Sequence, residues 1–157
     1  MNQYAQKKRN VTAGIIGGID FQRRFHSSLS SHSSVVSSFA CSPIEAWGET
    51  LGHKPNCLII EVGINYSQRD HIWLRDFLNQ VRDRFDKDVY IILTLLAPEK
   101  LFYAGDLLFT SENSLEASGY IDTFLAQAPA GFTNVPSLET QIVQAISLLS
   151  HEFERRE

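Results

Sequence analysis

Three features of this 157-residue sequence have the chemistry from which a binding or reaction site could be built. Glu61 and Thr94 stand at the ends of short apolar runs, and Gly17-Gly18 ends another. A carboxylate beside a hydroxyl can hold a cation, move a proton or carry a phosphoryl group, and paired glycines let a ligand approach the backbone. Simpler interpretations are a solvated carboxylate at a strand end, a β-forming threonine and a turn that needs positive φ.

Five apolar runs, separated by segments of helical period, predict the strands that position these residues. The runs are Val11–Ile16, Val35–Ala40, Cys57–Ile60, Val89–Leu95 and Tyr120–Leu125. The second run is short and serine-rich, which is typical of a sheet edge. We expect an α/β fold with a doubly wound, five-stranded parallel sheet, whose site lies beyond the carboxyl ends of the central strands.

The segments between the runs predict five helices. The clearest start is Ser42-Pro43-Ile44-Glu45, a capping box with proline at the first helical position. We expect this helix to turn Ile44, Trp47 and Leu51 inward and to stop at Gly52. The apolar stripes of the other helices are Phe21, Phe25 and Leu29; Ile72, Leu74, Leu78, Val81 and Phe85 within about Gln68–Phe85; Leu101, Phe102, Leu108 and Phe109 after Pro98; and Leu138, Ile142, Ala145, Ile146, Leu149 and Phe153 after Ser137.

Composition restricts the class of protein. With 43% hydrophobic and 20% charged residues, the chain fits one domain, which we place at 11–157 behind an N-terminal tail at 1–10. A net charge of −4 is the wrong sign for nucleic-acid binding, and Lys7-Lys8-Arg9 is best explained as a solvated tail. No apolar run is long enough to cross a membrane, and five scattered histidines lack metal-ligand spacing.

The two cysteines, Cys41 and Cys57, are sixteen positions apart and lie in or beside apolar runs. This pattern is typical of buried, reduced thiols in a cytoplasmic protein.

Two of the strands carry a family resemblance. Pro55-Asn56-Cys57-Leu58-Ile59-Ile60-Glu61 resembles the third strand of the receiver domains of bacterial response regulators, which ends in a phosphoacceptor aspartate. Val89-Tyr90-Ile91-Ile92-Leu93-Thr94 is similar to their fourth strand. The resemblance places Glu61 at the phosphoacceptor position and makes Thr94 and Phe124 the switch positions.

The departures from this family imply a degenerate receiver. Gly17-Gly18 replaces the acidic pair that holds Mg²⁺, leaving only Asp20 farther on, and one oxygen ligand is not a site. The lysine expected near Ala126 or Gln127 is missing. Glu61, one methylene longer than aspartate, imitates a phosphorylated aspartate more than it accepts a phosphoryl group. We therefore expect no enzyme activity, metal or cofactor.

Receivers signal through the face formed by their fourth and fifth helices and the strand between them. That part of this chain is rich in aromatics: Phe102, Tyr103, Phe109 and Tyr120 are the interface residues that we predict. The resemblance thus implies a phosphorylation-independent domain of bacterial signal transduction or transcriptional regulation. It would act by binding a protein partner or forming a homodimer.

An enzyme or a flavodoxin-like nucleotide or flavin binder is the alternative. Ala13–Ile19 also resembles the start of cofactor-independent aspartate/glutamate-type racemases, which use two cysteine thiols as opposed acid and base. Cys57, however, begins a strand, so its thiol is expected at the wrong end of the sheet. The spacing Gly14-x-x-Gly17-Gly18 is not the dinucleotide pattern G-x-G-x-x-G.

Overall fold

The computed structural model describes residues 10–100, 108, 115, 119–129, 131–132 and 134–156. Five parallel strands form one sheet in the order β2-β1-β3-β4-β5. Their bounds are β1 Val11–Ile16, β2 Val35–Cys41, β3 Cys57–Val62, β4 Tyr90–Leu95 and β5 Thr123–Ala126. The serine-rich strand β2 lies at an edge, as its sequence predicted.

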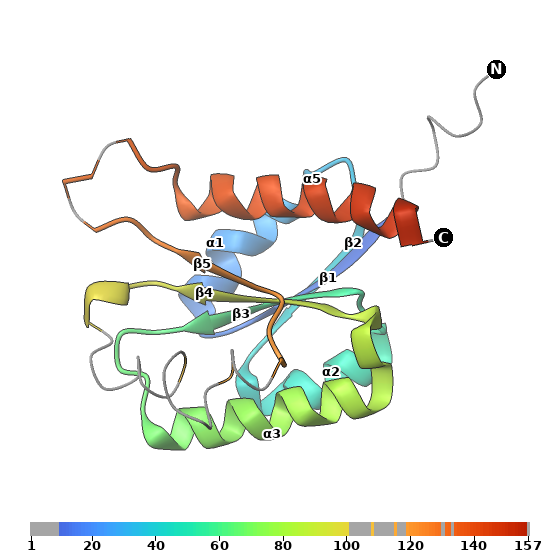
Figure 1. Ribbon diagram of the computed structural model, residues 1–157, viewed down its shortest axis with the longest axis horizontal. Helices are drawn as coiled ribbons and strands as arrows, with labels where there is room; N and C mark the ends of the chain where they lie inside the picture. The colour runs from blue at the N-terminus through green and yellow to red at the C-terminus, as the bar shows by residue number, and fades with distance from the viewer. Residues whose placement is uncertain are drawn as a thin grey trace.

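Helices cover both faces of the sheet (Figure 1). Helices α1 (Ile19–Ser30) and α5 (Leu138–Arg156) lie on one face, and α2 (Ala46–His53) and α3 (Gln68–Phe85) lie on the other. Three short 3-10 turns, η2 (Pro43–Glu45), η3 (Asp86–Asp88) and η4 (Pro98–Lys100), join elements. The predicted doubly wound α/β fold is therefore confirmed.

The core consists of two hydrophobic clusters, one on each face. Alternate residues of the central strands supply them: Ile60 and Leu93 pack under α2 and α3, whereas Ile59 and Ile92 pack under α1 and α5. This two-sided burial explains why β3 and β4 are continuous apolar runs instead of alternating ones.

The second helix starts as predicted but turns different residues inward. Ser42 and Glu45 form the capping box, and the turn that follows is 3-10 before it becomes α-helical. Helix α2 then buries Ala46 and Thr50, while Ile44 is 95% exposed and Leu51 is 37% exposed. The prediction for Ile44 and Leu51 was wrong because it assumed one α-helical phase from Pro43 onward.

The same helix also ends differently from the prediction. It continues one residue past Gly52, to His53. Lys54 then adopts the left-handed conformation, with φ of 50°, and its amide donates to the Thr50 carbonyl. A non-glycine residue thus serves as the helix C-cap, where the sequence suggested glycine.

Helix α3 has the predicted bounds, and Leu74, Leu78 and Val81 of the predicted apolar stripe are buried. Its buried residues are His71, Leu74, Phe77, Leu78 and Val81. Ile72, which we expected inside, is 53% exposed, and so that assignment was wrong. Ser67 begins the helix through a capping box with Asp70.

The last strand is shorter than predicted, because β5 begins at Thr123 instead of Tyr120. The predicted fourth helix, after Pro98, lies mostly outside the described residues. Pro98–Lys100 forms the 3-10 turn η4. Within the ranges that the structure describes, no helix combines the length and apolar character needed to cross a membrane.

Candidate functional site at the carboxyl end of the sheet

The chain changes direction across the sheet between β1 and β3, where folds of this kind bind ligands. Gly17 and Gly18 follow β1 at this point, and Glu61 lies near the end of β3. The Gly18 amide donates a hydrogen bond to Oε1 of Glu61 over 3.0 Å. Gly18 is also the N-cap of α1, so the carboxylate lies at the positive end of that helix.

Position 17 requires glycine because its neighbours leave no space for a Cβ atom, and not because its φ is positive. A Cβ atom at this position would lie 2.6 Å from Cδ2 of Phe21 and 2.9 Å from Cβ of Glu61. At Gly18 the nearest atom would be Oε1 of Glu61, at an ordinary 3.6 Å. Gly18 has φ of −67°, and the positive-φ glycines of the described chain are elsewhere. The positive-φ interpretation of the pair was therefore wrong.

Thr94 is the register partner of Glu61 across β4 and β3. The sheet thus brings together the three features that the sequence singled out. Thr94 is fully buried, and its hydroxyl donates to the carbonyl of Ile60 over 3.0 Å. In this arrangement its proton is used within the sheet, and a switch role would require the side chain to rotate.

Phe124, the second predicted switch position, is half-buried beside the cluster under α2 and α3. It pairs in register with Leu93, whereas Leu125 is the register partner of Thr94. Because neighbouring strand residues point to opposite faces, Phe124 and Thr94 belong to different faces of the sheet. The switch roles of both residues stay predictions.

Helix α1 supplies a cation, Arg24, near Gln127, where the resemblance to receivers led us to expect a lysine. Arg24 of α1 donates to Oε1 of Gln127 over 2.9 Å and also forms an ion pair with Glu139 of α5. This contact spans more than a hundred positions of sequence, and no local pattern pointed to it. Because Glu139 already neutralises it, Arg24 is a poor substitute for a free lysine.

A hollow of about 700 Å³ opens beside Glu61. It lies between the start of the second helical segment and the loop that joins β3 to α3. Its lining includes apolar, aromatic and charged side chains: Ile44, Glu61, Ile64, Tyr66, Arg69, Asp70 and Trp73. The exposed Ile44 that the helical pattern misplaced is therefore part of this hollow.

Both cysteines are buried, as the sequence predicted, and neither forms a disulfide. Burial raises the pKa of the Cys41 thiol to about 12, with further contributions from the charges of Glu49 and Glu45. Burial raises the pKa of Cys57 still farther, and Asp122 adds to this effect. Thiolate, the reactive form, is thus scarce at neutral pH for either residue. Cys57 also begins β3, at the end of the strand remote from Glu61.

Of the four predicted interface residues, Tyr120 alone lies in the described part of the chain; Phe102, Tyr103 and Phe109 lie outside it. Tyr120 is half-buried, and its hydroxyl donates to Oδ1 of Asn79 over 3.2 Å.

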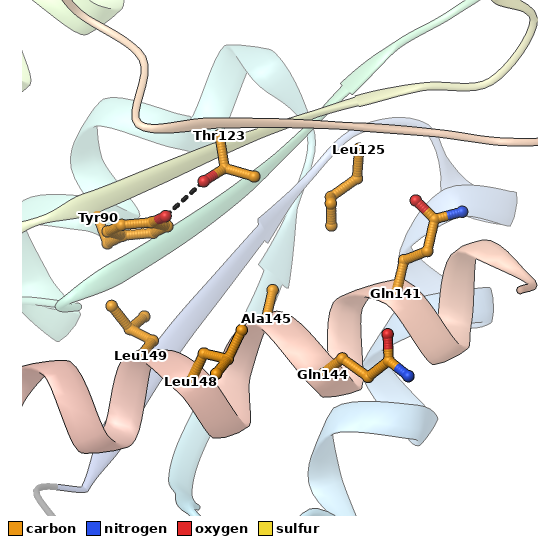
Figure 2. A pocket seen from close by; sticks show the side chains of 8 residues that line it. All are labelled: Tyr90, Thr123, Leu125, Gln141, Gln144, Ala145, Leu148 and Leu149. Atoms are coloured by element: carbon orange, nitrogen blue, oxygen red, sulfur yellow. Dashed lines mark hydrogen bonds between the residues drawn. The ribbon is translucent and has the colours of Figure 1, made fainter.

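A groove of about 540 Å³ runs between β4, β5 and helix α5 (Figure 2). The eight described residues that line it carry no formal charge: Tyr90, Thr123, Leu125, Gln141, Gln144, Ala145, Leu148 and Leu149. Tyr90 and Thr123 share a hydrogen bond across its floor, and Leu148 is 72% exposed. Within the described residues, no group of three or more histidine, cysteine, aspartate or glutamate side chains is placed to hold a metal ion.

Comparison with known proteins gives structural matches only. No protein-family model matches the sequence, and neither does any curated protein. The fold is similar to the signal receiver domain of the response regulator NarL from Mycobacterium tuberculosis, at a TM-score of 0.53 and 16% identity over 91% of this chain and 98% of that one. A protein of uncharacterised function from Neptuniibacter caesariensis matches at a TM-score of 0.59 and 15% identity, over 94% and 95%.

Another match is a Bacteroides fragilis protein described as a phosphosugar isomerase, at a TM-score of 0.46 and 13% identity over 98% of this chain and 73% of that one. That score is too low to support an argument about function. The comparisons together establish a receiver-like α/β fold.

Proposed function

We propose that this chain is a receiver-like signalling domain that works without phosphoryl transfer. The observation that carries the proposal is the contact between Glu61 and the glycine pair. The Gly18 amide occupies one oxygen of the carboxylate at 3.0 Å, and Gly17 leaves no room for a side chain. Phosphoryl transfer to a carboxylate needs a cation to neutralise developing charge, and a cation needs several oxygen ligands. Two glycines provide none from their side chains.

Incubation with acetyl phosphate and Mg²⁺, followed by intact mass spectrometry, tests this proposal. We expect no gain of a phosphoryl group under conditions in which a receiver domain with a complete acidic pair is fully modified. A stoichiometric gain that disappears in Glu61→Gln or Asp20→Asn would contradict the proposal.

We further propose that the domain passes its signal by self-association through the groove between β5 and α5. Support comes from the exposed Leu148 and from the uncharged lining of the groove, in a chain whose net charge is −4. Two copies that meet through a charged face of one sign would repel each other, whereas the amide of Gln144 can both donate and accept hydrogen bonds. The side-chain nitrogen of Gln141 donates to the carbonyls of Ala126 and Pro136, which leaves its oxygen as an acceptor. An isologous dimer would also bury Leu148.

Sedimentation velocity of wild type and Leu148→Glu is the corresponding test. We expect a dimer for wild type and a monomer for the variant, because a charge in the interface would lose its water without gaining a partner. Ile72→Glu is the matched control, since Ile72 is 53% exposed on α3 at the opposite face. A wild type that stays monomeric at millimolar concentration would rule out self-association.

A further inference from the structure

We infer that the hollow beside Glu61 binds a small organic cation, namely a protonated amine attached to an apolar group. The inference goes beyond the proposed signalling role and does not depend on it. All the lining residues that carry the argument lie in the described chain.

The size and the walls of the hollow fit a small molecule. Its volume of about 700 Å³ lies within the range of ligand sites, which are mostly apolar with a few polar groups that orient the ligand. Ile44 is 95% exposed and Ile64 is 52% exposed, and Trp73 is half-buried beside them. Exposed aliphatic side chains around an aromatic ring gain stability when an apolar ligand covers them.

The charged groups of the hollow favour an amine. Glu61 accepts one hydrogen bond within the described chain, at Oε1, although a carboxylate has about four sites at which it can accept. None of the ion pairs found among the described residues includes Glu61. Its carboxylate therefore keeps both charge and hydrogen-bonding capacity for an incoming ammonium group.

The groups next to Glu61 also favour a positively charged ligand. Asp70 adds a second carboxylate, which is partly used in capping α3 through the amide and hydroxyl of Ser67. Tyr66 and Trp73 supply aromatic rings, whose faces attract cations. Among the described residues that line the hollow, Arg69 is the one cation, and it is exposed, so water screens its repulsion.

Tryptophan fluorescence gives a direct readout because Trp73 lines the hollow and Trp47 is the other tryptophan of the sequence. In a Trp47→Phe background, Trp73 becomes the sole reporter. Phenethylamine is the probe, hydrocinnamate supplies a similar ring with a negative charge, and phenethyl alcohol supplies it without charge. We expect saturable binding of the amine at submillimolar to millimolar concentration, with weaker binding of the alcohol and none of the carboxylate.

Two variants separate charge recognition from general apolar binding. Glu61→Gln retains an oxygen for the Gly18 amide but loses the charge, and we expect it to weaken amine binding by about tenfold or more. Asp83→Asn removes the same charge from an exposed position outside the hollow and should leave binding unchanged. Ile44→Ser should weaken binding of the amine and the alcohol alike, without loss of folding by circular dichroism.

Three results would overturn the inference. They are no saturable response to phenethylamine, equal amine affinity in wild type and Glu61→Gln, and hydrocinnamate binding as tight as that of the amine. None of these results bears on phosphoryl transfer, so the inference and the proposed function fail or succeed separately.

Discussion

Arg82→Met is expected to lower the free energy of unfolding by about 2–4 kcal/mol, because it leaves a partly buried carboxylate and several carbonyls without their cation. The side chain of Arg82 is 13% exposed and links α3 to the segments that lead into β4 and β5. One terminal nitrogen donates to the carbonyls of Asp86 and Val89. The other donates to the carbonyl of Tyr120 over 2.9 Å and to Oδ2 of Asp122 over 2.8 Å.

The position of β5 depends on this cluster. Oδ2 of Asp122 also accepts from the amide of Ile91, so the guanidinium and the start of β4 together hold the segment that leads into β5. Strands β4 and β5 pair over four residues, so few backbone hydrogen bonds hold β5 at the edge of the sheet. Loss of Arg82 should therefore loosen β5 before it affects β1 or β3.

Chemical denaturation monitored by circular dichroism gives the change in stability, and hydrogen exchange shows whether β5 is affected first. Arg84→Met is the matched control, because Arg84 is exposed two positions along α3 and lies over the ring of Phe85. We expect the control to change the free energy of unfolding by at most about 1 kcal/mol, the upper value for an exposed cation–π contact. Equal effects of the two substitutions would refute the structural role assigned to Arg82.

The sequence was sufficient to predict most of the fold, because the decisive signals are local. Continuous apolar runs mark β3 and β4 as central strands, and the serines of β2 indicate an edge. The capping box at Ser42 marks a helix start. Each of these signals lies within a few neighbouring residues of the sequence and can be read without knowledge of the tertiary structure.

What sequence could not provide is the phase of short helices and the partners of long side chains. A 3-10 turn ahead of α2 rotates its inward face, so that Ala46 and Thr50 replace Ile44 and Leu51. One residue of rotation is enough to move an apolar side chain into solvent, and here it places Ile44 at the mouth of a hollow.

Four of the partners of Arg24 and Arg82 lie at least 38 positions away across the fold, at Gln127, Glu139, Tyr120 and Asp122. No spacing rule connects residues at such separations, because their proximity arises only when the sheet assembles. The candidate site could be predicted from the sequence only in part. The expected parallel sheet predicted that Gly17, Glu61 and Thr94 would lie at the same end of the sheet. It did not predict that the Gly18 amide would hold the carboxylate or that Thr94 would bond to Ile60.

Gly17→Ser is expected to lower the free energy of unfolding by about 1–3 kcal/mol, the usual cost of an extra group in a well-packed site. The new Cβ would lie 2.6 Å from the ring of Phe21 and 2.9 Å from Cβ of Glu61, closer than such atoms can approach. Phe21 is buried at 3% exposure, and its ring packs against the tilted ring of Phe25 at a centroid distance of 4.7 Å, so it has little space to yield. Glu61 would have to move, and its bond to the Gly18 amide would weaken with it.

Gly18→Ser makes the same chemical change one residue later and should not cost stability. Its Cβ would meet one atom at 3.6 Å, and its φ of −67° is open to any residue. Serine is also a better helix N-cap than glycine, by roughly a few tenths of a kcal/mol, so we expect a small gain in the stability of α1. Thermal and urea denaturation of both variants gives the comparison. Equal effects of the two substitutions would show that close packing does not exclude a side chain at position 17. The acidic pair of an active receiver could then be rebuilt at this turn without displacing Glu61.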